Sequence, residues 1–470
     1  MDSLRQGVPP KIRIESADEV IVVEYKRLKS KPGLVLLIAV ASCGILAAQE
    51  YEGPTVLSRS GGGLRPYGQR VGEESKMRVF VSAEVLYDYG FLPIATSTGG
   101  VPAKFGGQFG YQGRIGVYGT KRWRRTSLGL DYTGSYRGYV KNTYFNGADN
   151  FLGMEFGDQL DRKTLLTGSL TAGTSNRVFG FSSGLIGSPL GNLLPTTDIF
   201  DARTYFLNGG MGVSHQLTSR IGFELRAEGF RVERHSASLI SVQGYSPKAS
   251  MSYRLNRRQT VGGLYNFYHY EYPKAFGESN VHVAMAFWNY DVSRQWRFEA
   301  QGGAFVANNA GTRTVAADPI VQQLLGVKSI SEAFSRIVTL PNAQVKLTGK
   351  SGNSTVTFGV YRGVGAGNGV TLASSEQSGS IIYYYVFNKA LTTSARGTYT
   401  RAAGLSGVAD RYTTYSGGLS VDYNTANAIT YSFNSTFRHS DGTLFRSFNS
   451  DSFQLGLSVG WSLRDVPFIH

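Results

Sequence analysis

From residue 76 onward, the chain alternates apolar residues with small or polar ones in segments of roughly 9–14 residues. A period of two is typical of β-strands that have two different faces. About 18 such segments (16–18) follow one another as far as residue 463, so the sequence predicts an all-β fold. The first segment carries Val79, Val81, Ala83, Val85 and Tyr87 on one face and Arg78, Ser82, Glu84 and Asp88 on the other.

The connections between these segments alternate in length. Short turns are predicted at residues 121–125, 160–163, 217–220, 256–259, 292–295, 349–353, 388–390 and 424–427. Longer loops lie between them, for example at residues 92–104, 141–150, 176–200 and 306–334. Eight short turns and nine long loops fit 18 antiparallel strands whose two chain ends lie on one side. The sequence therefore predicts a single closed antiparallel transmembrane β-barrel with short periplasmic turns and long extracellular loops.

A soluble all-β protein, such as a propeller or an array of sandwiches, is the alternative. Propeller blades repeat a fixed motif about every 40–50 residues, and we find no such motif in this chain. The second face of each segment, rich in Gly, Ser and Thr, does not distinguish the two folds. The number of segments, the two classes of connection and an export signal favour the membrane barrel.

Residues 1–48 read as an export signal. A basic stretch, KRLKSK, begins at Lys26, an apolar run begins at Gly33, and small residues end it at Ala48, the expected cleavage point. Residues 1–22 precede this signal and are interpreted as an extension with a misassigned start, for which Val23 is the alternative first residue. Residues 49–75 form a Gly-rich periplasmic lead-in, residues 76–463 the barrel, and residues 464–470 a C-terminal tail.

Cys43, the one cysteine of the chain, follows Val40, Ala41 and Ser42 in a context that resembles a lipoprotein box. The alternative is a cysteine within the apolar part of the signal, removed on cleavage. The apolar run continues past Cys43 to Ala48, which favours the alternative. The mature chain would then contain no cysteine and no disulfide.

Composition excludes several classes of protein. Helical membrane proteins need several apolar runs of about 20 residues, and this chain has one short run and a mean hydropathy of −0.17. Disorder does not fit a chain in which 13% of residues are aromatic. The 59 Gly residues and the 17% of charged residues are unusual for a cytosolic enzyme.

The net charge of +15 would fit nucleic-acid binding, but the position of the charges argues against it. The first 48 residues carry seven basic and five acidic groups, so the remainder keeps +13. Most of this excess lies in the predicted short turns, where only Asp161 offsets the basic residues. We therefore expect a basic periplasmic rim that meets anionic phospholipid headgroups, and no nucleic-acid partner. The basic residues of the turns are Lys121, Arg122, Arg124, Arg125, Arg162, Lys163, Arg220, Arg257, Arg258, Arg294, Lys350 and Lys389.

With these strands and turns, residues 76–463 resemble Gram-negative outer-membrane β-barrel proteins, in particular porin-like channels of about 18 strands. The resemblance rests on pattern and topology and includes no family-specific motif. It implies an outer-membrane location, periplasmic barrel termini, contact with outer-membrane lipids and insertion by the barrel-assembly machinery. Such barrels usually end on an aromatic residue, whereas this chain continues as RDVPFIH after Leu463. Either Trp461 with Leu463, or Phe468, would take that role.

If the apolar faces point outward, the polar faces line a lumen. Basic and acidic groups on these faces are nearly balanced once Lys248, Arg438, Glu155 and Glu376 are included. Two interpretations stay open: opposed charges that orient dipolar solutes at a constriction, or lateral ion pairs that stiffen the wall. The residues expected to line the pore are Arg78, Glu84, Asp88, Arg114, Asp131, Arg137, Glu224, Arg226, Glu228, Arg254, Arg297, Glu299, Lys346, Arg396 and Asp422.

A loop is expected to narrow the pore. Residues 176–200 form the third long loop, and their apolar stretch is unusual for a free extracellular loop. The third loop of porins folds inward, and this one resembles it in position, with Leu185, Leu190, Leu193, Leu194 and Asp198 as the constriction residues. A second candidate is the loop at residues 306–334, where residues 318–325 could form a short helix. An outer cap or a latch between subunits is the alternative for both.

No enzyme chemistry is expected, and no catalytic residue, metal site or cofactor. His269 and His282 flank one hairpin without a nearby carboxylate pattern, which is a weak metal or catalytic signal. The Gly-rich segment 363–369, GVGAGNG, lies between strands and not before a helix, so it is interpreted as a loop.

The sequence thus predicts a channel for passive diffusion of small hydrophilic solutes through a pore that a loop narrows. The first alternative is a plugged structural or adhesion barrel that acts through its extracellular loops. The second is a polymer export channel, which the balanced lumen charges disfavour. Whether the barrel forms a homo-oligomer stays open.

Overall fold

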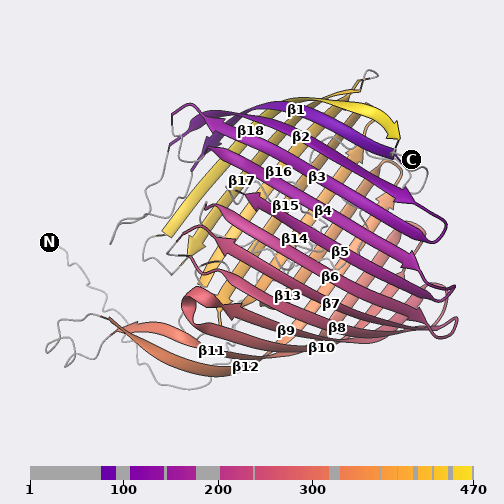
Figure 1. The fold of residues 1–470 in the computed structure, drawn as a ribbon, viewed down its shortest axis with the longest axis vertical. Helices are drawn as coiled ribbons and strands as arrows, with labels where there is room; N and C mark the ends of the chain where they lie inside the picture. The colour runs from indigo at the N-terminus through magenta and orange to yellow at the C-terminus, as the bar shows by residue number, and fades with distance from the viewer. Residues whose placement is uncertain are drawn as a thin grey trace, which may run out of the picture. The chain divides into compact units, whose positions relative to one another are not determined.

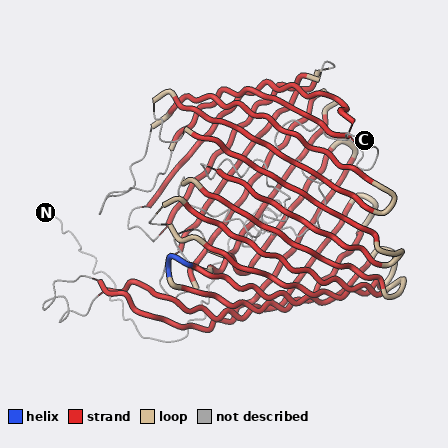
Figure 2. The backbone as a smooth tube through the Cα atoms, viewed as in Figure 1, coloured by secondary structure: helices blue, strands red, loops and turns tan. Residues whose placement is uncertain are grey.

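The computed structural model describes most of the chain from residue 76 onward (Figure 2). The described residues are 76–90, 106–141, 146–175, 202–236, 239–316, 329–367, 369, 372–388, 390–405, 411–425, 428–442 and 448–467. The expected signal (residues 1–48) and lead-in (49–75) lie outside them. No helix of the described residues has the length and apolarity to cross a membrane.

The described residues form 18 strands and one short 3₁₀ helix (Figure 1). In chain order the strands are β1 (Lys76–Tyr89), β2 (Gln108–Arg122), β3 (Thr126–Tyr139), β4 (Gly147–Gln159), β5 (Thr164–Ser175), β6 (Thr204–Gln216), β7 (Ile221–Arg234), β8 (Val242–Arg254), β9 (Gln259–Tyr272), β10 (Gly277–Asp291), β11 (Trp296–Ala316), β12 (Ser329–Ser351), β13 (Ser354–Gly365), β14 (Ser374–Val386), β15 (Leu391–Gly404), β16 (Arg411–Asn424), β17 (Ile429–Gly442) and β18 (Phe448–Pro467). The 3₁₀ helix η4 (Pro273–Ala275) joins β9 to β10.

The strands close into a barrel. Each strand pairs antiparallel with its neighbours in sequence, and β18 pairs back onto β1. This closure extends from Tyr89, opposite Phe453, to Lys76, opposite Pro467. Every strand of the ring therefore pairs with a strand on each side, which is the arrangement that a lipid environment demands. The predicted closed barrel of about 18 antiparallel strands is confirmed.

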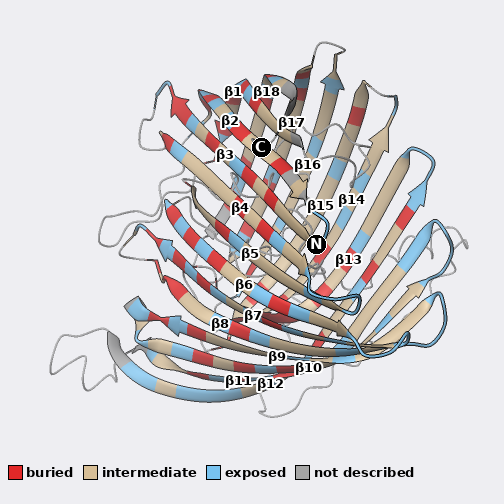
Figure 3. Cartoon of the chain, turned by 45° about the vertical axis from the view of Figure 1, so that its right-hand side comes forward, coloured by how far each residue is buried: buried red, intermediate tan, exposed pale blue. Residues whose placement is uncertain are grey.

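Burial alternates along the strands (Figure 3). In β1, Glu84 is 8% exposed and Asp88 is 0% exposed, whereas Val81 is 48% and Val85 is 63% exposed. Side chains on the concave inner surface of a closed barrel crowd against one another, so the buried positions face inward and the exposed positions face outward. Large apolar side chains are exposed on strands far apart in the ring, such as Leu225 on β7. A surface of this kind indicates a lipid-facing wall.

Several of the short turns share one hydrogen-bonding arrangement. In five of the turns, the second residue accepts hydrogen bonds from backbone N–H groups two or three residues further along. In the first of them, Asp161 Oδ1 accepts from Lys163 N–H at 2.6 Å and from Thr164 N–H at 2.9 Å. Short polar side chains favour tight turns because they satisfy these donors locally. The five residues are Asp161, Thr218, Asn256, Ser293 and Asn388.

The predicted loop at residues 306–334 is wrong in its extent. β11 continues to Ala316 and β12 begins at Ser329, and the two strands pair over their whole length. This stretch contains Asn308, Asn309 and Gly311, but an inward-facing Asn is compatible with a strand when it has a polar partner. Asn309 receives a hydrogen bond from Ser279 on β10. The helix expected at residues 318–325 lies outside the described residues.

Two other boundaries differ from the sequence prediction, and one link is shorter than the alternation of short and long connections implies. The link between β9 and β10 is short, because Pro273 starts a single 3₁₀ turn and Phe276, in a left-handed conformation, ends it. The loop expected at 141–150 is shorter, since β4 begins at residue 147. β18 continues past Leu463 to residue 467, where Val466 pairs with Met77, so the expected tail of residues 464–470 joins the barrel for part of its length.

The hydrogen bonds to Asp161 predict a pH-dependent turn. Donation from the backbone of Lys163 and from Thr164 holds the pKa of Asp161 below its usual value. A carboxylate with a lowered pKa contributes stability above its unfolded pKa and loses it as the pH falls through its folded pKa. We expect Asp161→Ala to lower the urea midpoint of unfolding at neutral pH, and Asp161→Asn to lower it less, because Asn256 and Asn388 close equivalent turns.

The midpoint is read from the heat-modifiable mobility of the folded barrel on gels. The difference between the native chain and Asp161→Asn should shrink as the pH falls below the ordinary range of carboxyl groups. A difference that does not change with pH contradicts this account of the turn.

Candidate functional site: the inner wall

The candidate site is the inner wall, which we define as the residues on the inward-facing positions of the 18 strands. Directly opposed residues of antiparallel strands point to the same side of a sheet. The register can therefore be followed from Glu84 around the ring and back to β1, and it assigns one consistent face except at the register shift between Met77 and Val79. All fifteen residues expected to line a pore occupy inner-wall positions, as do Lys248, Arg438, Glu155 and Glu376.

A hydrogen-bonded network covers the inner wall from β1 to β3. Arg114 contacts Glu84 at 2.6 Å and donates to Gln112 Oε1 at 3.1 Å. Arg137 donates to the same Gln112 oxygen at 3.2 Å. Closer to the end of the barrel away from the short turns, Tyr139 Oη donates to Asp88 Oδ2 at 2.5 Å. Gly456 on β18 leaves room for Glu84, because an added Cβ there would lie 2.0 Å from a Glu84 carboxylate oxygen.

A second network lies on β5 to β8. Arg226 on β7 forms an ion pair with Glu228 and donates to Ser169 Oγ on β5 at 3.2 Å. Ser250 on β8 donates to Glu224 Oε2 at 3.3 Å. Lys248 lies directly opposite Arg226 in the register, so two basic groups are neighbours on β7 and β8, with Glu224 and Glu228 on either side of Arg226 along β7.

A third set of charges lies on β10 to β12. Arg297 contacts Glu299 at 3.0 Å and Asp291 at 3.7 Å. Lys346 Nζ lies 4.0 Å from the second oxygen of Glu299. Within this set, Arg297 and Asp291 are exposed, at 60% and 55%, whereas Lys346 is only 9% exposed.

The remaining expected residues are distributed around the ring. Arg254 ends β8 and is exposed beside a short turn. Arg396 and Asp422 take inner positions on β15 and β16, and Arg396 extends along Gly418, where an added Cβ would lie 2.7 Å from Nε. Arg78 opposes Tyr118, and Asp131 is buried beside the same tyrosine in the register. These residues do not converge on one point.

One connection folds into the barrel at the end where the longer connections lie. It joins β13 to β14, and its described residues (366, 367, 369, 372 and 373) include Gly369, the last glycine of the GVGAGNG segment. Tyr272 Oη on β9 donates to the carbonyl of Ala366 at 3.2 Å, and Ile240 N–H donates to the carbonyl of Gly369 at 2.7 Å. The connection therefore crosses from β13 to the inner wall of β7, β8 and β9.

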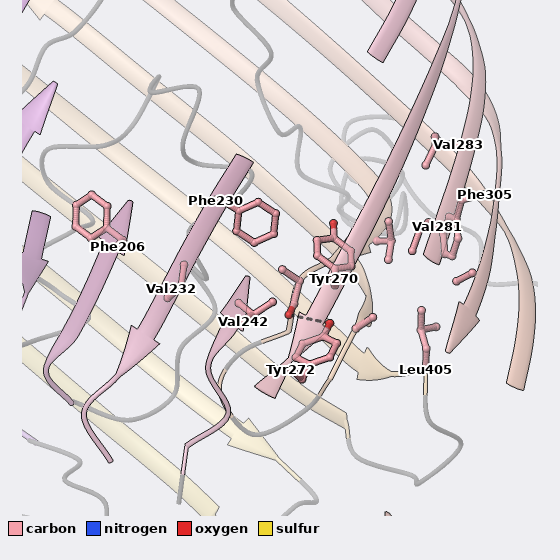
Figure 4. Packing of buried hydrophobic residues seen from close by; sticks show 14 residues of the cluster. Phe206, Phe230, Val232, Val242, Tyr270, Tyr272, Val281, Val283, Phe305 and Leu405 are labelled. Carbon is pink, nitrogen blue, oxygen red and sulfur yellow. Dashed lines mark hydrogen bonds between the residues drawn. The ribbon is translucent and has the colours of Figure 1, made fainter. Parts of the chain in front are cut away.

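An apolar cluster anchors this connection (Figure 4). Its wall residues come from β6 to β12 and include Phe230, Tyr270, Tyr272 and Phe305, each at most 6% exposed. Ala366 and Ala373 from the connection are buried in it, with Leu372 packed at its margin. Burial of these side chains stabilises the inward conformation by removing apolar surface from water.

Arg234 is a residue of this region that the sequence analysis missed. It ends β7 and is 1% exposed, and its guanidinium donates to the carbonyl of Ile240. Gly369 lies against it with φ of +85°, and an added Cβ would come within 2.8 Å of Arg234 Nε. The sequence contained a signal for this residue. Glu224, Arg226 and Glu228 are assigned to the inner wall by alternation, and the same alternation, continued to the end of β7, assigns Arg234 to it as well.

The expected constriction loop is not tested by these observations. Leu185, Leu190, Leu193, Leu194 and Asp198 all lie outside the described residues. Inward folding is observed for the connection between β13 and β14, which the sequence analysis interpreted only as a loop.

The histidines flanking one hairpin face outward. His269 Nδ1 contacts Asn280 Oδ1 at 2.8 Å, and His282 Nδ1 contacts Tyr265 Oη at 2.7 Å. Within the described part of the chain, no group of three or more His, Cys, Asp or Glu side chains gathers as a metal site would.

Comparison with known proteins gives structural similarity alone. No protein-family model matches the chain, and no curated protein sequence is similar to it. Among solved structures, Pseudomonas aeruginosa OpdK with vanillate is 13% identical and covers 82% of this chain and 98% of its own, with a TM-score of 0.40. Pseudomonas aeruginosa OccK2 (OpdF) with glucuronate is 15% identical, with coverages of 82% and 98% and a TM-score of 0.40. Acinetobacter baumannii OccAB4 is 9% identical, with coverages of 83% and 99% and a TM-score of 0.39.

The packing of Gly369 against Arg234 predicts the effect of one substitution. Gly369→Val requires a side chain at positive φ and within 2.8 Å of Arg234 Nε, so the connection should leave the wall. We expect a barrel that still folds and has an increased single-channel conductance in planar bilayers.

Gly352→Val is the matched control. Gly352 also has a positive φ, of +54°, but lies in a short turn with no atom within 4 Å of an added Cβ. Conductance should stay at the native value in this variant. Equal conductance of the native chain and Gly369→Val would contradict the role of this connection as a constriction.

Proposed function

We propose that the chain is an outer-membrane channel through which small hydrophilic solutes diffuse passively. The two-sided wall carries the proposal: large apolar side chains are exposed outward, while charged and amide side chains line the inside. A ring of 16–18 strands leaves a lumen wider than side chains can fill. Charged groups are costly in a dry interior unless partners or water solvate them, so this inner wall favours a water-filled lumen.

The charges of the inner wall would act on solutes through local pairs of opposite sign. Arg114 with Glu84, Arg226 with Glu228 and Arg297 with Glu299 form such pairs on three separate parts of the wall. A near balance of signs suits dipolar or uncharged hydrophilic solutes and disfavours export of a strongly charged polymer. The fifteen expected pore-lining residues are proposed in this role, and no catalytic role is proposed.

The inward connection between β13 and β14 would limit the size of solutes near its end of the barrel. Its contacts with Tyr272, Ile240 and Arg234 hold backbone inside the ring, where it reduces the free cross-section. Residues 176–200, proposed as a constriction loop from the sequence, would add to this narrowing. A plug across the full lumen is the alternative, with function in the extracellular connections.

The location proposed is the outer membrane, with the barrel termini and short turns in the periplasm. The start of β1 and the end of β18 lie at the same end of the barrel as the short turns. Basic residues of these turns are exposed, among them Arg162, Lys163, Arg220, Arg257 and Arg258. They would contact anionic phospholipid headgroups, and the barrel-assembly machinery is the partner proposed for insertion.

Single-channel recording in planar bilayers tests the proposal. The purified chain should give stepwise ion currents that stay open at low voltage. Correctly inserted barrels without current would contradict the channel and favour the plugged alternative. Insertion is checked separately by protease protection and by the heat-modifiable mobility of the folded barrel.

Ion selectivity tests the inner-wall charges. Glu84→Gln leaves Arg114 without its 2.6 Å partner, so the anion-to-cation permeability ratio should rise. Arg114→Gln should lower it. The change is expected to be roughly twofold to fivefold, because one charge at a few ångströms from an ion in water contributes on the order of 1 kcal/mol.

The control for selectivity is an outward position of the same strand. Val85→Thr changes a 63% exposed lipid-facing residue and should leave the permeability ratio unchanged. If Glu84→Gln and Arg114→Gln shift the ratio in the same direction, their side chains do not act on the permeating ions.

The exposed basic turns predict a lipid effect that is separate from selectivity. The double variant Arg257→Gln, Arg258→Gln should insert more slowly into vesicles that contain anionic phospholipid, by roughly fivefold for each charge removed. Insertion into neutral vesicles and the ion selectivity of the inserted channel should both be unchanged.

Arg231→Gln provides a matched surface control. Arg231 is 62% exposed on the outer side of β7, at the end away from the short turns, where it pairs with Glu233 at 3.3 Å. An equal slowing in this variant would mean that the short turns have no special role in lipid contact.

A further inference from the structure

Two arginines lie in one row on the outer side of the barrel, near the end away from the short turns. β13, β14 and β15 are neighbours in the ring (Figure 1). Arg362 lies directly opposite Gln377, and Gln377 lies directly opposite Arg401. Glu376 occupies the inner wall, so alternation places its neighbour Gln377, and with it the whole row, on the outer side. We call these three residues the arginine row.

Aromatic side chains mark the height of the arginine row relative to the membrane. Tyr399 and Tyr415 face outward at the next outward position towards the short turns, with ring centroids 5.1 Å apart. Tyr423 is exposed near the short-turn end of β16, and the exposed Leu419 lies between the two ends. Aromatic girdles border the apolar band of outer-membrane barrels. The arginine row therefore lies just beyond this band, at the level of lipid headgroups.

The two arginines of the row have no partner among the described residues. Neither side chain forms an ion pair or a hydrogen bond with another residue in this part of the chain, and both are partly buried. The Nε of Arg362 is fully buried and has no acceptor. Because a charged group without partners is costly to bury, an anion from outside the chain would stabilise the row.

The same end of the outer side is not uniformly basic. Arg231 is the fourth residue from this end of β7, as the members of the arginine row are on their own strands. However, Arg231 already forms an ion pair with Glu233 at 3.3 Å. On β9 and β10, Glu271 and Glu278 are exposed and directly opposite each other. The arginine row is therefore a local basic site and not part of a continuous basic rim.

We propose that the arginine row binds a phosphate group of a glycolipid in the outer leaflet of the outer membrane. Guanidinium groups form charge-assisted, bidentate hydrogen bonds with phosphate. Neighbouring strands lie about 4.7–4.9 Å apart, so Arg362 and Arg401 flank the position of Gln377 at a distance that long side chains can bridge. The Gln377 amide supplies a further donor. This site rests on the membrane orientation proposed above, which puts the end away from the short turns at the cell surface.

Binding of purified lipopolysaccharide to the full chain in detergent tests the proposal. The double variant Arg362→Gln, Arg401→Gln should raise the dissociation constant by roughly fivefold for each charge removed. The double variant Arg362→Lys, Arg401→Lys should raise it less, because lysine keeps the charge but not the bidentate geometry. Lipopolysaccharide whose phosphates have been removed with hydrofluoric acid should bind the native chain and the glutamine variant equally.

Arg231→Gln is the matched control. It removes an outward arginine at the same position relative to its strand end, but one that already has Glu233 as its partner, so the dissociation constant should stay native. Folding of each variant is checked by heat-modifiable mobility. Single-channel conductance of the variants should also stay native, so failure of this proposal is distinguishable from failure of the channel.

Three results would overturn the proposal. The first is an equal dissociation constant for the native chain and the double glutamine variant. The second is an equal loss of binding in Arg231→Gln, which would indicate a general charge effect. The third is unchanged lipopolysaccharide binding together with slower insertion of the double glutamine variant into vesicles of anionic phospholipid. The arginine row would then contact phospholipid, and the proposed orientation of the barrel would be wrong.

Discussion

Closure of the backbone hydrogen-bond ladder is the constraint on which the rest of this structure depends. A sheet that faces lipid cannot leave a row of N–H and C=O groups without partners, and pairing of β18 with β1 removes the last open edge of the ring. Once the ring is closed, every strand has one shielded face and one exposed face. The alternation in the sequence then becomes a polar inner wall and an apolar outer wall.

The described residues depart from a simple ring at two notable places. At one, the connection between β13 and β14 turns inward and replaces solvent with Ala366, Leu372 and Ala373 against an apolar patch of wall. At the other, β12 separates from β13 before Pro341 and extends with β11 as an arm. The first would set the size of the lumen.

Much of the fold could be predicted from the sequence, because the alternation of polar and apolar residues within a strand is enough to assign its two faces. The alternating residues from Arg78 to Asp88 are enough to assign the two faces of β1 without reference to any other strand. Short polar residues such as Asp161 and Asn256 mark the short turns in the sequence. The register then follows from the turns. The inner-wall positions of Glu84, Arg114 and Arg226 required only this local information.

What could not be predicted depends on partners distant in sequence. Asn309 looks like a loop residue until Ser279 on β10 is known to lie beside it. In the sequence, the Gly-rich segment 363–369 looks like an ordinary loop. Tyr272 and Arg234, which contact this segment in the structure, lie more than ninety residues earlier in the chain. Arg234 itself was within reach of the alternation, but its burial depends on that same connection.

Thiol labelling along β1 in the intact membrane tests the central claim of a two-sided wall around water. Single cysteines replace Val81, Ser82, Ala83, Glu84 and Val85 in turn, and a charged, membrane-impermeant thiol reagent is added from the side of the short turns. The account predicts labelling at Ser82 and Glu84 and none at Val81, Ala83 and Val85. Labelling without alternation would contradict the assignment of the two faces, and absence of labelling at Ser82 and Glu84 would contradict a water-filled lumen.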